Sequence, residues 1–388
     1  MDTGLLKMPN TEISIVLPCL NEEKAIGMCL DNINKVIIEN KLDAEVIVVD
    51  NGSTDKSKEI VKRKQAKLRA LILIEEKQRG YGSAYLHGFR EAKGKYIFMA
   101  DSDGSYNFSE IPKFIKELRA GYDFVIGNRF KGEIEKGAMP FSHRYIGNPI
   151  LSAVLRVFFK TKIKDAHCGM RAITRSALDK LNLKTTGMEF ASEMIIKAAK
   201  NNLKIKELPI NYQKRAGNSK LKSFPDGWRH LRFMLLYCPL FLFFIPGLIL
   251  FLLGLLSLLW MYFGTPEVLG TKLYYHPMFL SSLLVIVGYQ LIIFALFAKT
   301  YAATHLGEKN TLQRLYKHIT IEKASIIGII ITLFGIIIYL TIFIGWVKSE
   351  FSGLEQVKNS ILALTLIVVG IQTIFSSFML SILGIKEK

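Results

Sequence analysis

The distribution of apolar residues divides the chain into two parts. Up to about residue 232, short continuous apolar runs alternate with longer stretches that mix apolar and polar residues. Short apolar runs are typical of buried strands, and the mixed stretches are typical of helices, the first of which we expect to begin near Asn21 and Glu22. The strand-like runs lie at residues 13–17, 46–49, 71–74, 96–100 and 124–126. Because alternating strands and helices usually form a parallel sheet covered on both faces, residues 1–232 are predicted to form an α/β domain.

The second part, residues 233–388, is dominated by long apolar segments. These lie at about residues 235–263, 277–298, 324–347 and 361–383. Each meets the requirement of roughly 20 residues for a helix that crosses a membrane. Their centres carry no Asp, Glu, Lys or Arg, which argues against an ion or proton path. We therefore expect an all-α membrane domain of four transmembrane helices.

The charge of the chain is strongly positive: 51 Lys and Arg stand against 33 Asp and Glu, a formal net charge of +18. In a soluble protein this would suggest nucleic-acid binding, but no nucleic-acid module is recognisable. Basic residues instead crowd the approach to the first long apolar segment, in a juxtamembrane stretch from about residue 213. Such a stretch favours contact with anionic lipid, although a solvated basic face is the simpler alternative.

The loops and termini predict an orientation. The loop between the second and third apolar segments and the C-terminus carry most of the Lys and Arg of this half. The positive-inside rule then places the N-terminal domain and both termini in the cytoplasm. Residues 1–10 lack the features of a signal peptide, and the four cysteines are scattered, as expected for a reducing compartment.

The candidate chemistry is concentrated at the ends of the predicted strands. Asp101 and Asp103 follow the apolar run 96–100. Two carboxylates one residue apart can share a hard divalent cation and leave its other positions to water and phosphate oxygens, which suits a nucleotide-diphosphate leaving group. Pro18, Asp50 and Arg129 fall at the ends of other predicted strands, where ligands of open α/β sheets bind. Asp55 is interpreted as a helix cap.

Several segments resemble a known family. Residues 18–23 (PCLNEE), 49–55 (VDNGSTD) and 101–103 (DSD) are similar to motifs of the inverting family 2 glycosyltransferases, which have the Rossmann-like GT-A fold. Residues 127–129 (GNR), 165–172 (DAHCGMRA) and 215–221 (RAGNSKL) resemble the branch that acts on polyprenyl phosphates. That branch includes the dolichol-phosphate mannose synthases and the polyisoprenyl-phosphate glucosyltransferases. The resemblance covers about residues 13–232.

The resemblance implies roles for individual residues. Pro18, Asn21, Glu22 and Asp50 would hold the nucleoside part of the donor, and Asp101 and Asp103 would bind Mg²⁺ or Mn²⁺. Arg129 would contact donor phosphate or acceptor, with Asp103 and Arg215 as its catalytic partners. Some mannosyl members place a Gln metal ligand where this chain has Ser105, so that role is not carried over. The Q-x-x-R-W motif of processive members is absent, which favours a single transfer.

A lipid phosphate acceptor is already anionic near neutral pH, so the site needs positioning and charge neutralisation more than a strong base. Candidates for the lipid phosphate are His143, Arg144, Asn148 and Ser219. Arg215, Ser219 and Lys220 lie on a Gly-containing loop that could close over the donor pyrophosphate. Residues 150–159 are expected to form an apolar helix, which lies either at the membrane interface or in the core.

Two further patterns leave alternatives open. Glu189 and Glu193 share a helix face and would either orient the sugar or pair with Arg171 or Arg215. His167 and Cys168 lack further ligands at metal-binding spacing and are interpreted as ordinary structural residues.

The predicted function is transfer of one hexose from a GDP- or UDP-hexose to dolichyl or undecaprenyl phosphate, by a multi-pass enzyme of the cell membrane. The alternatives are a glycosyltransferase that uses diacylglycerol or a lipid-linked glycan, and a lipid translocator with a nucleotide-sugar sensor. The sequence leaves the sugar, the base, the polyprenyl chain and the oligomeric state open.

Overall fold

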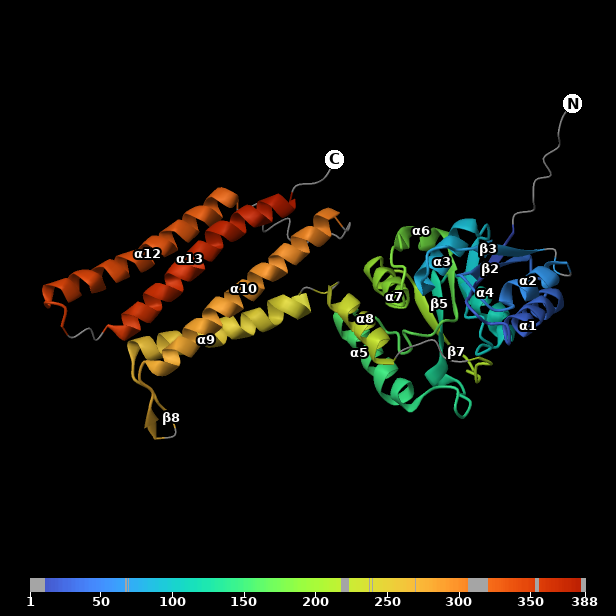
Figure 1. Ribbon diagram of the computed structural model, residues 1–388, viewed down its shortest axis with the longest axis horizontal. Helices are drawn as coiled ribbons and strands as arrows, with labels where there is room; N and C mark the ends of the chain where they lie inside the picture. The colour runs from blue at the N-terminus through green and yellow to red at the C-terminus, as the bar shows by residue number, and fades with distance from the viewer. Residues whose placement is uncertain are drawn as a thin grey trace, which may run out of the picture. The chain divides into compact units, whose positions relative to one another are not determined.

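The computed structural model describes residues 11–66, 68, 70–217, 223–236, 238, 240–268, 270–305, 320–352 and 356–384. The chain divides into two compact units, Met1–Met234 and Leu235–Lys388 (Figure 1).

Within its described residues, the first unit is built on a seven-stranded sheet with the order β3-β2-β1-β4-β6-β5-β7. The strands are β1 (Ile13–Cys19), β2 (Ala44–Asp50), β3 (Leu71–Glu75), β4 (Tyr96–Met99), β5 (Phe124–Asn128), β6 (Arg171–Thr174) and β7 (Ile205–Pro209). β1 to β4 are parallel, β7 is parallel to β5, and β6 is antiparallel to both of its neighbours. The predicted mostly parallel sheet of the GT-A type is therefore confirmed.

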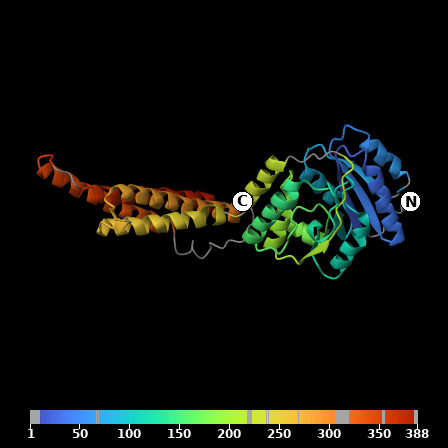
Figure 2. The same cartoon turned by 90° about the horizontal axis from the view of Figure 1, so that it is seen from below.

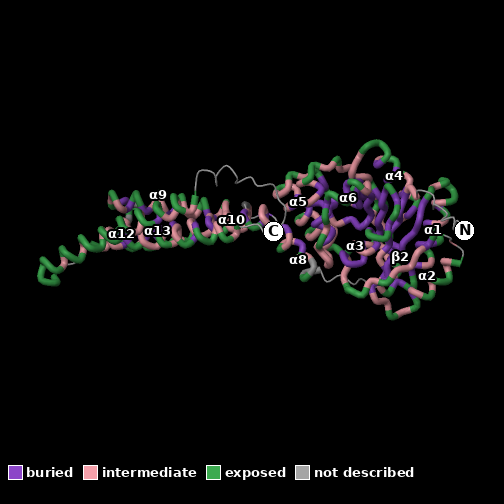
Figure 3. The backbone as a smooth tube through the Cα atoms, turned by 90° about the horizontal axis from the view of Figure 1, so that it is seen from above, coloured by how far each residue is buried: buried purple, intermediate pink, exposed green. Residues whose placement is uncertain are grey.

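Helices cover this sheet on both faces, and the buried centre of the unit lies between them and the strands (Figure 3). The helices of this unit are α1 (Ile26–Glu39), α2 (Ser57–Gln65), α3 (Tyr81–Glu91), α4 (Ile111–Arg119), α5 (Asn148–Phe159), α6 (Arg175–Leu181), α7 (Phe190–Lys200) and α8 (Ser223–Leu236). Short 3-10 helices lie at Phe108–Glu110 and Arg129–Lys131, and a π-helix at Ser142–Gly147. Every residue of β2 is buried, which explains its unbroken apolar run.

The first helix begins later than its predicted start near Asn21 and Glu22. Asn21 adopts a left-handed conformation with φ 51°, and α1 begins at Ile26. The intervening loop is tied to the loop after β2, because Asn21 Oδ1 accepts a hydrogen bond from Thr54 N at 2.7 Å. The first two sequence motifs are thus joined by hydrogen bonds between their loops.

The second unit consists of long apolar helices. α9 (Ile245–Phe263) follows a π-helix at Leu240–Phe244, and α10 (His276–His305), α12 (Ile321–Lys348) and α13 (Val357–Gly384) follow in turn. A short hairpin of β8 (Glu267–Val268) and β9 (Thr271–Lys272) joins α9 to α10. In the described part of the chain, four helices are long and apolar enough to cross a membrane, as predicted. The first candidate span runs over Phe241–Phe263 rather than from residue 235, since α8 extends to Leu236.

Inside this unit, α9 packs on α10, α12 packs on α13, and α10 contacts α13 (Figures 1 and 2). Glycines allow close approach: a Cβ on Gly254 of α9 would lie 2.6 Å from the backbone nitrogen of Val285. Neutral hydrogen bonds join α10 to α13, between Ser282 and Thr365 at 2.6 Å and between Tyr289 and Thr373 at 2.6 Å. Small residues and neutral polar pairs are the usual contacts between helices in lipid.

Candidate active site

A cavity of about 540 Å³ lies at the edge of the sheet where the parallel strands end. Its walls take residues from the ends of β1, β2, β4 and β5, from the π-helix, from the loop before β6, and from α7 and α8. In the sheet, β1 and β2 lie on one side of β4, and β6 and β5 lie on the other. The cavity therefore spans the sheet edge, with the carboxylates that follow β4 between its two sides.

Most of the predicted site residues line this cavity. They are Pro18, Glu22, Asp101, Asp103, Arg129, His143, Asn148 and Arg215. Asn21, Asp50 and Arg144 are not among its lining residues. Ser219 and Lys220 lie outside the described residues, so their predicted roles have no structural counterpart here.

Asp101 is half-buried in the cavity wall. Its Oδ1 accepts a hydrogen bond from the Tyr81 hydroxyl at 3.0 Å. Its Oδ2 lies against Gly169, where a Cβ would approach to 2.5 Å, so a glycine is required beside this carboxylate. Burial, followed by the charge of Asp103, raises the pKa of Asp101 to about 6.

Asp103 has partners on both oxygens. Its Oδ1 accepts hydrogen bonds from the backbone N of Ser105 at 2.9 Å and from its hydroxyl at 2.5 Å. Its Oδ2 forms an ion pair with Nη2 of Arg215. The Nε of Arg215 is buried and has no hydrogen-bond partner within the described part of the chain. Burial alone would lower the pKa of Arg215, but Asp103 outweighs it and keeps the pKa above its usual value.

Asp101 and Asp103 are the residues that could hold a metal. Both side chains line the cavity, and the charge of Asp103 contributes to the raised pKa of Asp101, so a cation close to both carboxylates would be favoured, which fits a hard divalent ion. Among the described residues, no group of three or more His, Cys, Asp or Glu side chains has a metal-binding arrangement. Phosphate oxygens and water can supply the further ligands that a metal on these two carboxylates would need.

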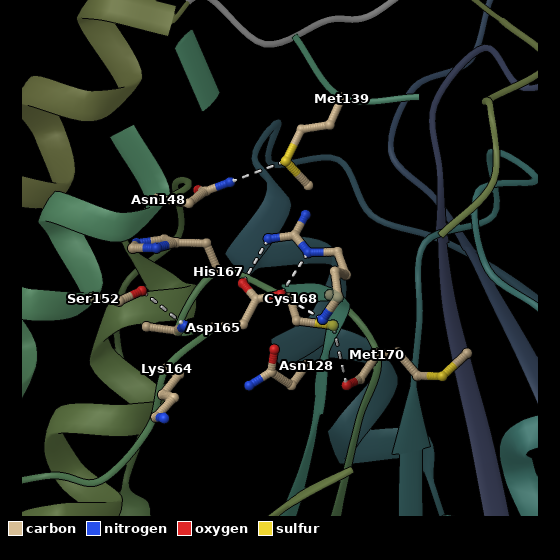
Figure 4. Close-up of polar contacts among 12 residues, drawn as sticks. Asn128, Met139, Asn148, Ser152, Lys164, Asp165, His167, Cys168 and Met170 are labelled. Carbon is tan, nitrogen blue, oxygen red and sulfur yellow. Dashed lines mark hydrogen bonds and ion pairs between the residues drawn. The ribbon is translucent and has the colours of Figure 1, made fainter. Parts of the chain in front are cut away.

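Arg129 is fixed by a buried ion pair. Its Nε and Nη2 donate to the two carboxylate oxygens of Asp165, each at 2.8 Å, and its backbone N donates to Oδ2 at 2.9 Å. Asp165 is fully buried and lies at the centre of Figure 4. The guanidinium also lies 5.2 Å from the centre of the Tyr212 ring. The predicted phosphate contact of Arg129 would therefore come from a group that Asp165 already orients.

Asp50 and Asn51 organise the loops on the β1–β2 side. The Asp50 carboxylate accepts hydrogen bonds from Gly52 N at 3.1 Å and Ser53 N at 3.2 Å, and Lys58 Nζ lies 3.4 Å away. Asn51, which sequence reasoning did not single out, lines the cavity. Its amide donates to the Gln78 carbonyl at 2.8 Å and accepts from Gly80 N at 2.7 Å. Asn51 thus fixes the loop that carries Arg79 into the cavity wall.

The acceptor candidates divide between the cavity and the surface. His143 and Asn148 line the cavity, and Asn148 Nδ2 lies 3.7 Å from Met139 Sδ (Figure 4). Arg144 instead lies over the ring of Tyr145, 5.4 Å from its centre. In α5, which covers the predicted apolar helix, Leu155 is fully buried while Val157 is 62% exposed. One face of this helix therefore belongs to the core and the other does not.

Glu193 has a structural role rather than a sugar-binding one. It accepts hydrogen bonds from Thr185 N at 2.9 Å and Thr185 Oγ1 at 2.6 Å, and pairs with Lys197 Nζ at 2.7 Å. Glu189 does not line the cavity. Arg171, a proposed ion-pair partner, instead donates to three backbone carbonyls, of Ala166, Cys168 and Ala191, at 2.8–2.9 Å.

His167 and His230 line the cavity, and sequence reasoning assigned neither of them a role in the site. The two rings are 4.5 Å apart, centre to centre, and Ser192 lies within hydrogen-bond distance of both. Burial lowers the pKa of His167 well below its usual value, and the charges of His230, Arg171 and Arg129 lower it further. Because the two histidines are 63 positions apart, no local sequence pattern could have paired them.

Comparisons with known proteins show the family of the chain. Residues 14–181 match the family described as "Glycosyl transferase family 2", and residues 296–384 match its C-terminal transmembrane region. The low-salt glycan biosynthesis hexosyltransferase Agl6 of Haloferax volcanii is 38% identical over 374 residues, which are 96% of this chain and 89% of that protein.

Two further relatives match a little more than half of this chain. A dolichyl-phosphate hexose transferase of Haloferax volcanii is 32% identical over 56% of this chain and 89% of its own length. A dolichol-phosphate mannosyltransferase of Pyrococcus furiosus is 28% identical over 54% of this chain and 59% of its own length. The chain therefore belongs to glycosyl transferase family 2, as a glycosyltransferase with a membrane domain.

Proposed function

We propose that this enzyme moves a single hexose from a nucleotide-diphosphate hexose to a polyprenyl phosphate, with inversion and with the help of a divalent cation. The observation that carries the proposal is one cavity that combines the Asp101–Asp103 pair with Arg129, Arg215 and several histidines. Carboxylates for a metal and cations for phosphate are the groups that this reaction requires. The names of two relatives, which refer to dolichyl and dolichol phosphate, support the same acceptor class.

The carboxylates of the cavity favour an acceptor that needs no deprotonation. Among the described lining residues, these carboxylates are Glu22, Asp101 and Asp103. Two of them are assigned to the metal, and Glu22 to the donor side. A diacylglycerol or glycan hydroxyl would need a general base, whereas a phosphate monoester is already an anionic nucleophile.

The reaction balances without a proton acceptor. An oxygen of the lipid phosphate attacks the anomeric carbon, the bond from that carbon to the donor diphosphate breaks, and the diphosphate leaves with the bonding electrons. Attack from the face opposite the leaving group inverts the anomeric configuration. A divalent cation held by Asp101 and Asp103 would neutralise the charge that develops on the diphosphate.

The protein's own residues have distinct tasks in this scheme. Nη2 of Arg215 pairs with Asp103, while its Nε has no hydrogen-bond partner among the described residues and can donate to a diphosphate oxygen. Arg129, oriented by Asp165, presents a fixed cation between the donor and acceptor phosphates. The two cations would reduce the repulsion between the attacking and leaving anions. In this proposal the catalytic unit and both termini lie in the cytoplasm, following the distribution of Lys and Arg.

A transfer assay tests this function. The purified full chain is incubated with Mg²⁺ or Mn²⁺, a short polyprenyl phosphate and a panel of UDP- and GDP-hexoses, and lipid products are identified by mass. Parallel reactions contain the matching polyprenol or diacylglycerol. We expect one hexose on the polyprenyl phosphate, no product with either alcohol, and loss of product with a chelator. Transfer to diacylglycerol, or donor hydrolysis that ignores the lipid phosphate, would contradict the proposal.

A further inference from the structure

His167 and His230 form a pair on the cavity wall, and the buried Ser192 lies within hydrogen-bond distance of both rings. Ser192 Oγ lies 2.8 Å from Nδ1 of His230 and 3.4 Å from Nε2 of His167. Ser192 is fully buried and is not among the residues that line the cavity. One hydroxyl group therefore orients both imidazole rings, and both rings contribute to the wall.

The surroundings of this pair are positively charged. Arg171 is 1% exposed and donates to backbone carbonyls, and among the described residues it has no carboxylate partner. Arg129, by contrast, is balanced by Asp165. Burial first, and then the charges of His230, Arg171 and Arg129, lower the pKa of His167, as expected where the local potential is positive. An anion bound against the rings would complement this potential.

The pair lies on the side of the cavity away from the β1–β2 loops. His167 belongs to the loop that leads into β6, and β6 and β1 flank β4 on opposite sides. The donor nucleotide is assigned to the β1–β2 side, and the metal to the carboxylates that follow β4. His230 comes from α8, whose chain continues into the second unit at Leu235. A ligand that contacts His230 is thus bound by the segment that leads to the membrane helices.

We infer that His167 and His230 bind the headgroup of the lipid acceptor and select a phosphate monoester over an alcohol. The inference rests on the proposed function, since it assigns the acceptor end of the same cavity. An imidazole N–H can donate a hydrogen bond to a phosphate oxygen. Ser192 lies against Nε2 of His167, and Nδ1 of that ring is buried with no hydrogen-bond partner among the described residues, so a phosphate oxygen would supply one. The two histidines extend the acceptor site beyond His143 and Asn148.

The test is direct binding of tritiated farnesyl phosphate, and of farnesol, to the detergent-solubilised full chain. The variants are His167→Asn, His230→Asn and Ser192→Ala. His87→Asn is the matched control, because His87 is a partly buried histidine of the same unit that pairs with Glu76 at 3.1 Å and does not line the cavity. Binding of UDP and GDP and the thermal unfolding midpoint are measured on every variant.

We expect wild type to prefer farnesyl phosphate over farnesol, and each histidine variant to weaken farnesyl phosphate binding about tenfold, the effect of losing one hydrogen bond to a charged group. Ser192→Ala should weaken it less, because both imidazoles remain. Farnesol binding, nucleotide binding and the unfolding midpoint should stay at wild-type values, and His87→Asn should change none of them.

Unchanged farnesyl phosphate binding in both histidine variants would overturn the inference. An equal loss of nucleotide and farnesyl phosphate binding would overturn it too, because the rings would then only support the fold. Failure of the proposed function looks different: wild type would bind farnesyl phosphate, and the variants would lose it, but no hexose would be transferred.

Discussion

The catalytic unit and the membrane unit handle buried polar groups in opposite ways. The catalytic unit contains ion pairs at one cavity, buried Arg129 with Asp165 and half-buried Arg215 with Asp103. In the membrane unit, the contacts between α10 and α13 use neutral groups, such as Ser282 with Thr365, and glycines let helices approach closely. A buried charge lowers the stability of the fold unless it is paired, and buried charged groups are concentrated at functional sites.

This difference predicts that substitutions will have effects of different size in the two units. In the first unit, removing one partner of a buried pair leaves an uncompensated charge, so single substitutions should have large effects. In the second unit, each neutral contact is weak, and the helices are held by many of them together. We therefore expect single substitutions to change the transfer rate strongly in the first unit and to change the stability of the second unit only slightly.

The largest effect is expected at the metal-binding pair. Asp103→Asn keeps the shape of the side chain but removes the negative charge that would hold the divalent cation at the leaving diphosphate. The rate of transfer should therefore fall by about 10³-fold. The measurement is the initial rate of hexose transfer to a short polyprenyl phosphate. Asp31→Asn, which makes the same change in an ion pair with Lys64 outside the cavity, should leave the rate unaltered. A near-wild-type rate for Asp103→Asn would refute the metal assignment.

Next in size is the effect of Asp165→Asn on stability. The substitution leaves the Arg129 guanidinium buried without a counter-charge, so the free energy of unfolding of the catalytic unit should fall by about 3 kcal/mol. The matched control is Glu12→Gln, which breaks an ion pair of similar geometry between Glu12 and a half-exposed Arg119. That control should cost about 1 kcal/mol or less. Equal losses in the two variants would remove the distinction between buried and surface charges.

In the membrane unit, disturbing the packing of two helices should lower stability more than removing one hydrogen bond between them. Gly254→Leu inserts a side chain where Val285 N would lie 2.6 Å from the new Cβ, so α9 and α10 must separate, at a cost of about 1–3 kcal/mol. Gly345→Leu is the control, because nothing lies within 4 Å of a Cβ at Gly345. Thermal unfolding in detergent should show the loss only for Gly254→Leu, with UDP and GDP binding retained. Similar melting of both variants would argue against glycine packing.

The smallest effect is predicted for Thr365→Val. This substitution keeps the shape of the side chain and removes its hydrogen bond to Ser282, which should cost about 0.6 kcal/mol. Thr341→Val is the comparison, because Thr341 is exposed and bonds to a carbonyl of its own helix. A loss at Thr365 as large as that at Asp165 would break the contrast between the units.

Much of the fold could be predicted from the apolar pattern alone. The strands β1 to β5 and the four long helices follow it, since continuous burial leaves continuous apolar runs. β6 and β7 could not be found this way. β6 is four residues long and begins with Arg171, whose charge is satisfied by backbone carbonyls, and β7 is only partly buried.

The sequence indicated which residues belong to the candidate site, but not which of them contact one another. The strand-end rule and the family motifs indicated Asp101, Asp103 and Arg129. Neither rule reveals that Asp165 neutralises Arg129, or that Asp103 pairs with Arg215, which is 112 positions away. His230 lies in a stretch that looks like a basic approach to the membrane, and only the fold brings it to His167.

The most direct test of the central claim is the structure of the first lipid product. The enzyme is given a nucleotide hexose of known α configuration and a short polyprenyl phosphate, and the product is analysed by mass and by the NMR coupling of its anomeric proton. Attack by the lipid phosphate on the anomeric carbon predicts one hexose per lipid, joined to phosphate in the β configuration. An α-linked sugar, several sugars on one lipid, or a sugar joined to anything other than the phosphate would contradict it.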